Sequence, residues 1–175
     1  MFAIIALTVV VLIAAVLIYA ATKPDTFRVQ RSISINAPPE RILAHINDLT
    51  KWGAWSPWEK MDPAMKKTLS DAPQGKGAVC EWNGNNAVGQ GRMEILESLP
   101  ASKILIKLDF LKPFEAHNFA EFIFERNGNS TNVTWAMFGP APYIAKVISL
   151  FMNCDKMVGP QFETGLANMK AVTEM

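Results

Sequence analysis

The chain has 175 residues, a formal net charge of +1, and a hydrophobic content of 50%. This length is sufficient for one domain with a hydrophobic core. The near-neutral charge argues against a nucleic-acid binder, which usually carries a basic patch or stripe. The two cysteines lie far apart and neither histidine is near a cysteine, so we expect no metal site and no disulfide framework. No nucleotide-binding glycine motif occurs, and we expect no cofactor.

The first segment, Met1–Ala21, carries no charge, and Thr8 and Tyr19 hold its only polar side-chain groups. At about 1.5 Å per residue, a helix of this length spans roughly 30 Å, the thickness of the hydrocarbon core of a bilayer. We therefore predict a retained transmembrane anchor. A cleaved signal peptide is the alternative, because Ala20 and Ala21 are small residues suited to a peptidase. A signal peptide usually begins with a basic region, however, and none is present here.

The predicted organisation is a transmembrane anchor over residues 1–22, a linker over 23–26, and a soluble domain over 27–175. Basic residues follow the apolar span and none precedes it: Lys23, Arg28 and Arg31. By the positive-inside rule, the soluble domain is expected on the cytoplasmic side of a single-pass membrane protein.

Residues 27–35 alternate between apolar and polar side chains, which predicts a half-buried strand. Arg31 interrupts the apolar face, and we expect it near the rim. Two prolines at 38 and 39 then open a predicted helix, since proline is tolerated in the first helical turn.

Trp52, Trp55 and Trp58 are spaced three residues apart in the next segment. Such a cluster is typical of a packed cap over the edge of a core. It is also typical of the lip of a ligand-binding cavity, and tryptophan is enriched at membrane interfaces as well. We name the three residues as the candidate cavity mouth, with the packed cap and the lipid interface as alternatives.

Six predicted strands follow, and hairpin turns separate two pairs of them at residues 83–86 and 127–128. Gly89 and Gly91 lie within one strand and allow it to bend. The expected strands cover residues 65–70, 77–82, 88–96, 103–110, 115–125 and 131–138.

The C-terminal stretch, residues 141–174, is the longest amphipathic segment of the predicted soluble domain. Its apolar residues recur at steps of three and four, which predicts a helix with one apolar stripe. Gly159 and Pro160 interrupt the pattern, and we expect a kink or break there that divides the helix in two. The stripe comprises Leu150, Cys154, Met157, Val158, Phe162, Leu166, Met169 and Val172.

This order of elements resembles the START-like superfamily, also called SRPBCC or helix-grip proteins, and within it the polyketide cyclase/dehydrase branch. The resemblance covers everything after the predicted anchor. The residues that carry it are Arg31–Ile42, Asp48-Leu49 with Trp52 and Trp55–Trp58, Gly75–Gly77, Gly89–Met93, Thr131–Trp135 and Gly165-Leu166.

The resemblance implies an α+β fold in which a curved antiparallel sheet wraps around the long C-terminal helix, behind one transmembrane helix. It also implies an apolar cavity for a lipid, a polyketide or a similar molecule. Such cavities are mainly apolar, so we select large residues on the faces expected to turn inward. The candidate ligand-binding residues are Trp82, Met93, Ile95, Phe110, Trp135, Met137, Met157, Phe162 and Met169.

Catalysis would require an acid–base group inside the cavity. His117, Glu121 and Arg92 are the candidates, but the opposite face of the strand that carries His117 is at least as apolar. We therefore expect His117 to be exposed or structural and Arg92 to be external, and we name no catalytic residue. His45 is expected at the boundary of its helix.

Three functions stay open from the sequence. The first is a membrane-anchored binding domain for a small hydrophobic ligand or lipid, without a nucleic-acid partner. The second is a cyclase- or dehydrase-like enzyme acting on a hydrophobic substrate. The third is a membrane-anchored protein-interaction module that holds no ligand.

Overall fold

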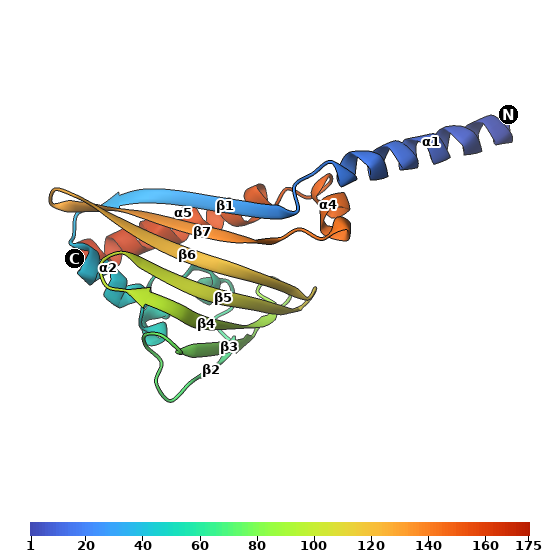
Figure 1. Ribbon diagram of the computed structural model, residues 1–175. Helices are drawn as coiled ribbons and strands as arrows, with labels where there is room; N and C mark the ends of the chain where they lie inside the picture. Colours follow the sequence, from blue (N-terminus) through green and yellow to red (C-terminus); the bar gives the residue numbers. More distant parts are fainter.

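A seven-stranded antiparallel sheet curves around the C-terminal helix in the computed structural model, which describes residues 1–175 (Figure 1). The strands are β1 (Thr26–Ile35), β2 (Lys66–Leu69), β3 (Val79–Asn83), β4 (Gln90–Leu99), β5 (Lys103–Lys112), β6 (Ala116–Asn127) and β7 (Ser130–Pro140). The helices are α1 (Phe2–Ala21), α2 (Pro39–Ile46), the 3-10 helix η1 (Leu49–Ala54), α3 (Pro57–Met61), α4 (Tyr143–Ser149) and α5 (Cys154–Glu174). This is the helix-grip α+β fold that the sequence predicts.

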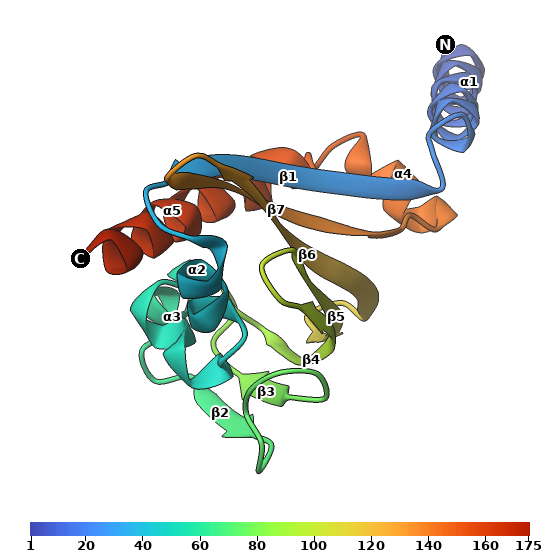
Figure 2. The ribbon, with the colours of Figure 1, turned by 60° about the vertical axis from the view of Figure 1, so that its left-hand side comes forward.

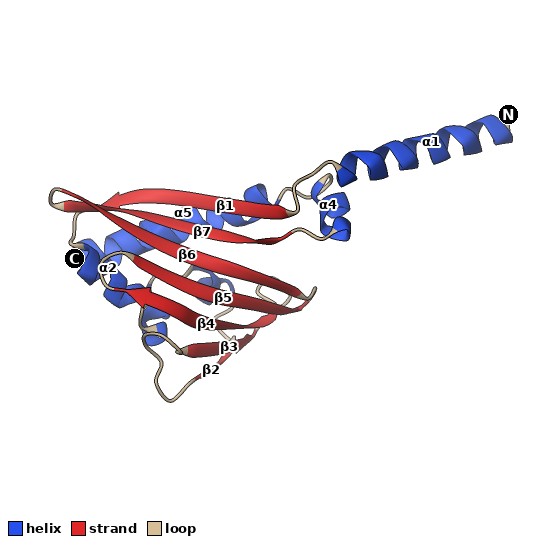
Figure 3. Cartoon of the chain, in the orientation of Figure 1, coloured by secondary structure: helices blue, strands red, loops and turns tan.

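The strand order is β1-β7-β6-β5-β4-β3-β2, so strands β2 to β7 follow one another as a meander. The N-terminal strand then pairs with the last one, with Thr26 opposite Pro140 and Ile35 opposite Thr131. The register is irregular in β4 beside Gly91 and again between Ile95 and Glu97, where the strand bends. The sheet therefore has two edges, β1 and β2, and α5 lies beside β1 (Figure 3).

Alternation along each strand separates an inner face, which turns towards α5, from an outer face. The inner face and the apolar side of α5 form one hydrophobic core, which α2 and η1 complete at the end of the sheet away from α1 (Figure 2). The strand faces predicted from alternation are confirmed. Core residues include Ile95, Ile104, Ile106, Phe122, Val133, Phe162, Leu166 and Met169.

The predicted break in the C-terminal helix is real, but its predicted position is wrong. The chain leaves the helix between Ser149 and Cys154, while Pro160 lies inside α5. Asn153 explains the new start, because its side chain accepts a hydrogen bond from the Lys156 amide at 3.3 Å and caps the helix. Pro160 removes one backbone hydrogen bond, and the packing of the following turns outweighs that loss.

Arg31 is the one charged residue on the inner face of β1, and it connects this strand to α5. Its guanidinium donates to Asp155 at 2.8 and 3.0 Å and to Glu163 at 2.6 Å. Gly159 lies beside the guanidinium, which contacts the helix where a side chain would otherwise stand. The hydrogen bond from Arg31 lowers the pKa of the Asp155 carboxyl. The sequence prediction of a position near the rim is consistent with its half-buried state.

Gly165 permits α5 to approach the sheet, because a Cβ there would lie 2.7 Å from Trp135 Cζ3 and 3.1 Å from Pro57 Cδ. We expect Gly165→Val to lower the free energy of unfolding by about 1–3 kcal/mol through overpacking. Ala167→Val, on the exposed side of the same helix, should cost only the difference in helix propensity, less than about 1 kcal/mol. Urea denaturation measures both, and equal losses would contradict the close approach at Gly165.

Candidate functional site

The centre of the inner face is filled by an aromatic cluster around Trp135, which we define as Trp135, Phe122, Phe162, Trp55 and Trp58. The Trp135 ring stacks on Phe162 with centroids 4.2 Å apart and on Phe122 at 4.9 Å. Trp55 and Trp58 contact it edge-on at 5.4 and 5.5 Å. Side chains therefore occupy the region between α5 and the middle of the sheet.

Trp52 and Trp55 do not form a cavity mouth, because they are 7% and 0% exposed. Their indole nitrogens donate to the carbonyls of Ile46 and His45, at 2.9 and 3.2 Å. They are the packed cap that the sequence offered as an alternative. This burial also removes both residues from a lipid interface. Trp58, which belongs to the aromatic cluster, is half-buried and is the only one of the three tryptophans with a partly exposed surface.

At the end of the sheet opposite α2 and η1, which is the end near α4, the inner face is less well covered by other side chains. Trp82, Met93, Leu108 and Phe110 lie on this face and are only half-buried. Met93, Leu108 and Phe110 pack against the core. The Trp82 ring extends over Gly91, where a Cβ would lie 2.5 Å from Cζ2, and meets Phe110 edge-on at 5.8 Å. We call these four side chains the open end. Met93 lies opposite Leu108, and Phe110 lies opposite Gly91 under the Trp82 ring, so the four side chains are neighbours on one apolar surface.

The remaining predicted ligand-binding residues divide into three groups. Ile95, Phe162 and Met169 are buried in the core, and Met137 is 8% exposed on the inner face towards the open end. Met157 is 57% exposed, so its predicted inward position is wrong. In the first turns of α5, Cys154 and Val158 pack against the core instead. A role in ligand binding stays a prediction for the others.

Trp135 Nε1 is the one buried side-chain nitrogen or oxygen without a hydrogen-bond partner. A buried donor without an acceptor costs about 1–3 kcal/mol, and native structures contain few of them. The atom is enclosed within the domain, so only an acceptor that enters the domain can satisfy it. The sequence identified Trp135 as a lining residue, but it gave no signal that its nitrogen lacks a partner.

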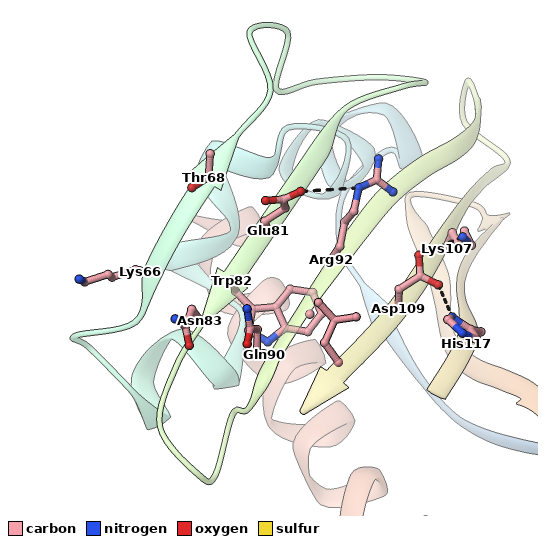
Figure 4. Close-up of a pocket in the computed structure, with 12 residues that line it drawn as sticks. Lys66, Thr68, Glu81, Trp82, Asn83, Gln90, Arg92, Lys107, Asp109 and His117 are labelled. Carbon is pink, nitrogen blue, oxygen red and sulfur yellow. Dashed lines mark hydrogen bonds and ion pairs between the residues drawn. The ribbon is translucent and has the colours of Figure 1, made fainter. Parts of the chain in front are cut away.

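A polar hollow of about 530 Å³ lies on the outer face, opposite the open end (Figure 4). Glu81, Arg92, Asp109 and His117 form a row across neighbouring strands there. His117 Nδ1 and Asp109 Oδ1 are 2.7 Å apart, and Lys107 also pairs with Asp109, at 2.9 Å. Burial raises the pKa of the Asp109 carboxyl, but the hydrogen bonds from His117 and Lys107 outweigh it, and the pKa is lowered.

The charged residues of this outer row form ion pairs with one another and with neighbouring side chains. Arg92 pairs with Glu94 at 2.8 Å, and Thr68 carries the only hydroxyl among the lining residues. No three His, Cys, Asp or Glu side chains converge as metal ligands. His117 and Arg92 lie on the outer face of the sheet, as expected. Glu121 is also on the outer face and pairs with Arg28 at 3.1 Å. The candidate acid–base groups are therefore separated from the apolar interior by the sheet.

Comparison with known families adds to this geometry. The family model described as "Polyketide cyclase / dehydrase and lipid transport" matches residues 26–174. The chain belongs to this family. The match covers every strand of the sheet together with α5, and the resemblance expected from the sequence is confirmed. A search of curated proteins finds no match.

Solved structures share the fold at low sequence identity. A structural-genomics protein from Chromobacterium violaceum has a TM-score of 0.60 and 14% identity, covering 87% of this chain and 99% of its own. The di-domain ARO/CYC protein BexL from the BE-7585A biosynthetic pathway has a TM-score of 0.67 and 14% identity, covering 90% of this chain and 53% of its own. A protein from Mycobacterium smegmatis has a TM-score of 0.59 and 18% identity, covering 86% and 92%.

The unpartnered nitrogen can be tested with two matched substitutions in the aromatic cluster. Trp135→Phe removes a donor that has no partner, whereas Trp55→Phe removes one that is bonded to His45. Both side chains are buried and both changes shrink the ring by the same amount. We expect Trp135→Phe to be less destabilising than Trp55→Phe by about 1–3 kcal/mol in chemical denaturation. Equal losses would mean that Nε1 has a partner in solution.

Proposed function

We propose that the chain is a membrane-anchored binding domain for a small hydrophobic molecule or lipid. The observation that carries this proposal is the open end, where four large apolar side chains on the inner face are only half-buried. Apolar surface of this kind gains about 25 cal/mol for each Å² that a ligand removes from water. The lipid transport named in the family description supports the same chemistry.

The anchor in this proposal is α1, which is long and apolar enough to cross a membrane and is not buried against the domain. Under the proposal, residues 1–22 span the bilayer, 23–26 link, and 27–175 form the binding domain. Lys23, Arg28 and Arg31 follow the span, which supports a cytoplasmic location for the domain. A helix inserted across a membrane holds the domain close to a source of hydrophobic molecules.

A cyclase- or dehydrase-like reaction is the second candidate, because the family description includes it. Such a reaction needs a proton donor or acceptor on the inner face. Apart from Asp109 on the outer face and Lys146 in α4, the buried polar residues are Ser56, Asn118, Thr131 and Thr173, and none is an acid or a base. Thr131 and Thr173 donate to the carbonyls of Ala37 and Met169, at 2.7 Å each. These contacts favour binding over acid–base catalysis.

Two leucines on β5 provide a matched test of the binding proposal. Leu108 belongs to the open end, and Leu105 is half-buried on the outer face of the same strand. The full chain is purified in detergent and analysed by native mass spectrometry for a co-purifying molecule of lipid size. We expect that mass in the wild type and in Leu105→Gln, but not in Leu108→Gln, because a polar side chain at the open end removes apolar contact.

Circular dichroism confirms that both variants are folded before their masses are compared. A ligand mass retained in Leu108→Gln would place any bound molecule elsewhere. A wild-type protein that carries no ligand mass and takes up no oleate would contradict the binding function itself.

A further inference from the structure

In α4 the charged side chain is buried and large apolar side chains are exposed, which is the reverse of the pattern in a helix of a soluble protein. Its only charged residue, Lys146, is 8% exposed, whereas Ile144 and Ile148 are 66% and 46% exposed. The turn that follows continues the pattern, since Phe151 and Met152 are 76% and 52% exposed. A contiguous group of exposed large apolar side chains marks a surface that contacts a partner or a membrane.

This helix lies directly beside the end of α1, as Figures 1 and 2 both show. The Tyr143 hydroxyl donates to the carbonyl of Leu17 at 2.8 Å. Leu17 lies about one turn before the end of α1 at Ala21, so the contact is within roughly 6 Å of that end along the helix axis. Interfacial helices bury their apolar face about 5–10 Å into the headgroup region. The contact between α4 and α1 lies at a similar distance from the end of α1.

The linker fixes α4 in this position. Asp25 accepts a hydrogen bond from Lys146 Nζ, and its backbone carbonyl accepts one from the Ala141 amide at 2.7 Å. The hydrogen bond from Lys146 lowers the pKa of the Asp25 carboxyl. The buried lysine thus ties α4 to the chain that leaves α1, and the apolar side of α4 is left facing outward.

A second apolar tip lies at the same end of the sheet. Because β6 begins beside the end of β7, the turn between β5 and β6 is on the α4 side of the molecule. Phe114 in this turn is 79% exposed, and Leu111 just before it is 49% exposed. Lys112 lies between them and Lys23 follows α1, which suits a surface that meets lipid headgroups.

We propose that these side chains are a second membrane contact, inserted into the interface of the leaflet from which α1 emerges. The docking surface comprises Ile144, Ile148, Phe151, Met152, Leu111 and Phe114. The inference rests on the proposed anchor, because α1 identifies the partner as the bilayer. Docking directs the α4 end of the domain towards the lipid, and the open end lies on that side. A hydrophobic molecule can then pass between the bilayer and the inner face without crossing bulk water.

The test uses the full chain in nanodiscs of phosphatidylcholine and phosphatidylglycerol, with one nitroxide label at a time. Ile148→Cys and Phe151→Cys report on the docking surface, and Ala44→Cys, on the exposed side of α2, is the matched helical control. All three are made with Cys154→Ser. The remaining Cys80 is buried, and burial raises the pKa of its thiol to about 11, so it does not compete for the label.

Collision rates with oxygen, which concentrates in the bilayer, are compared with those of a water-soluble nickel complex. We expect oxygen to dominate at positions 148 and 151 and nickel to dominate at position 44. Dominance of nickel at all three positions in protein that stays with the nanodiscs would overturn the docking surface while leaving the anchor intact. Protein that separates from the nanodiscs would overturn the anchor and the docking surface together, whereas failure of ligand uptake alone would affect only the binding function.

Discussion

The stacking of Trp135 between Phe122 and Phe162 sets the distance between the sheet and α5, and the rest of the structure depends on it. Gly165 is required at the point where the helix passes this indole, because any side chain there would collide with the ring. Packed interiors tolerate neither voids nor overlap, so this cluster holds α5 in one position. The cluster fills the space between α5 and the middle of the sheet, and it confines any binding surface to the end of the sheet near α4.

The two faces of the sheet have different chemistry as a result. Ion pairs cover the outer face around Asp109 and His117, where a largely buried carboxylate pairs with the more exposed Lys107 and His117. Apolar side chains cover the inner face, and the only unmatched polar atom there is Trp135 Nε1. A ligand that is mostly apolar is complementary to the exposed part of this inner face. The exposed apolar side chains of α4 are complementary to lipid in the same way, because they lie beside α1.

Much of the fold follows from sequence periodicity. Alternation placed Ile104 and Ile106 inward and Arg92 outward, because one face of an antiparallel sheet is buried and the period of a strand is two. The helix boundary was harder, since Pro160 is a strong breaker by itself, yet the cap supplied by Asn153 decided where α5 begins. Met157 was misplaced because it lies beside the stripe that packs inward, which runs through Cys154, Val158 and Phe162 in one continuous helix.

The site could be predicted only in part. Periodicity shows which residues face inward, but it does not show how completely their volumes fill the space between sheet and helix. The three tryptophans illustrate this limit: the same spacing suits a mouth and a cap, and only the hydrogen bonds of Trp52 and Trp55 to α2 decide for the cap. The missing partner of Trp135 Nε1 is likewise a property of three-dimensional packing and leaves no trace in the sequence.

The central claim is that a hydrophobic molecule binds at the open end and leaves the aromatic core unchanged. Methyl NMR of the methionines tests it most directly, because Met93 and Met137 lie at or beside the open end while Met169 is buried in the core. In full-length protein in nanodiscs titrated with oleate, the methyl signals of Met93 and Met137 should shift and that of Met169 should stay in place. A shift at Met169 with no change at Met93 and Met137 would contradict the account.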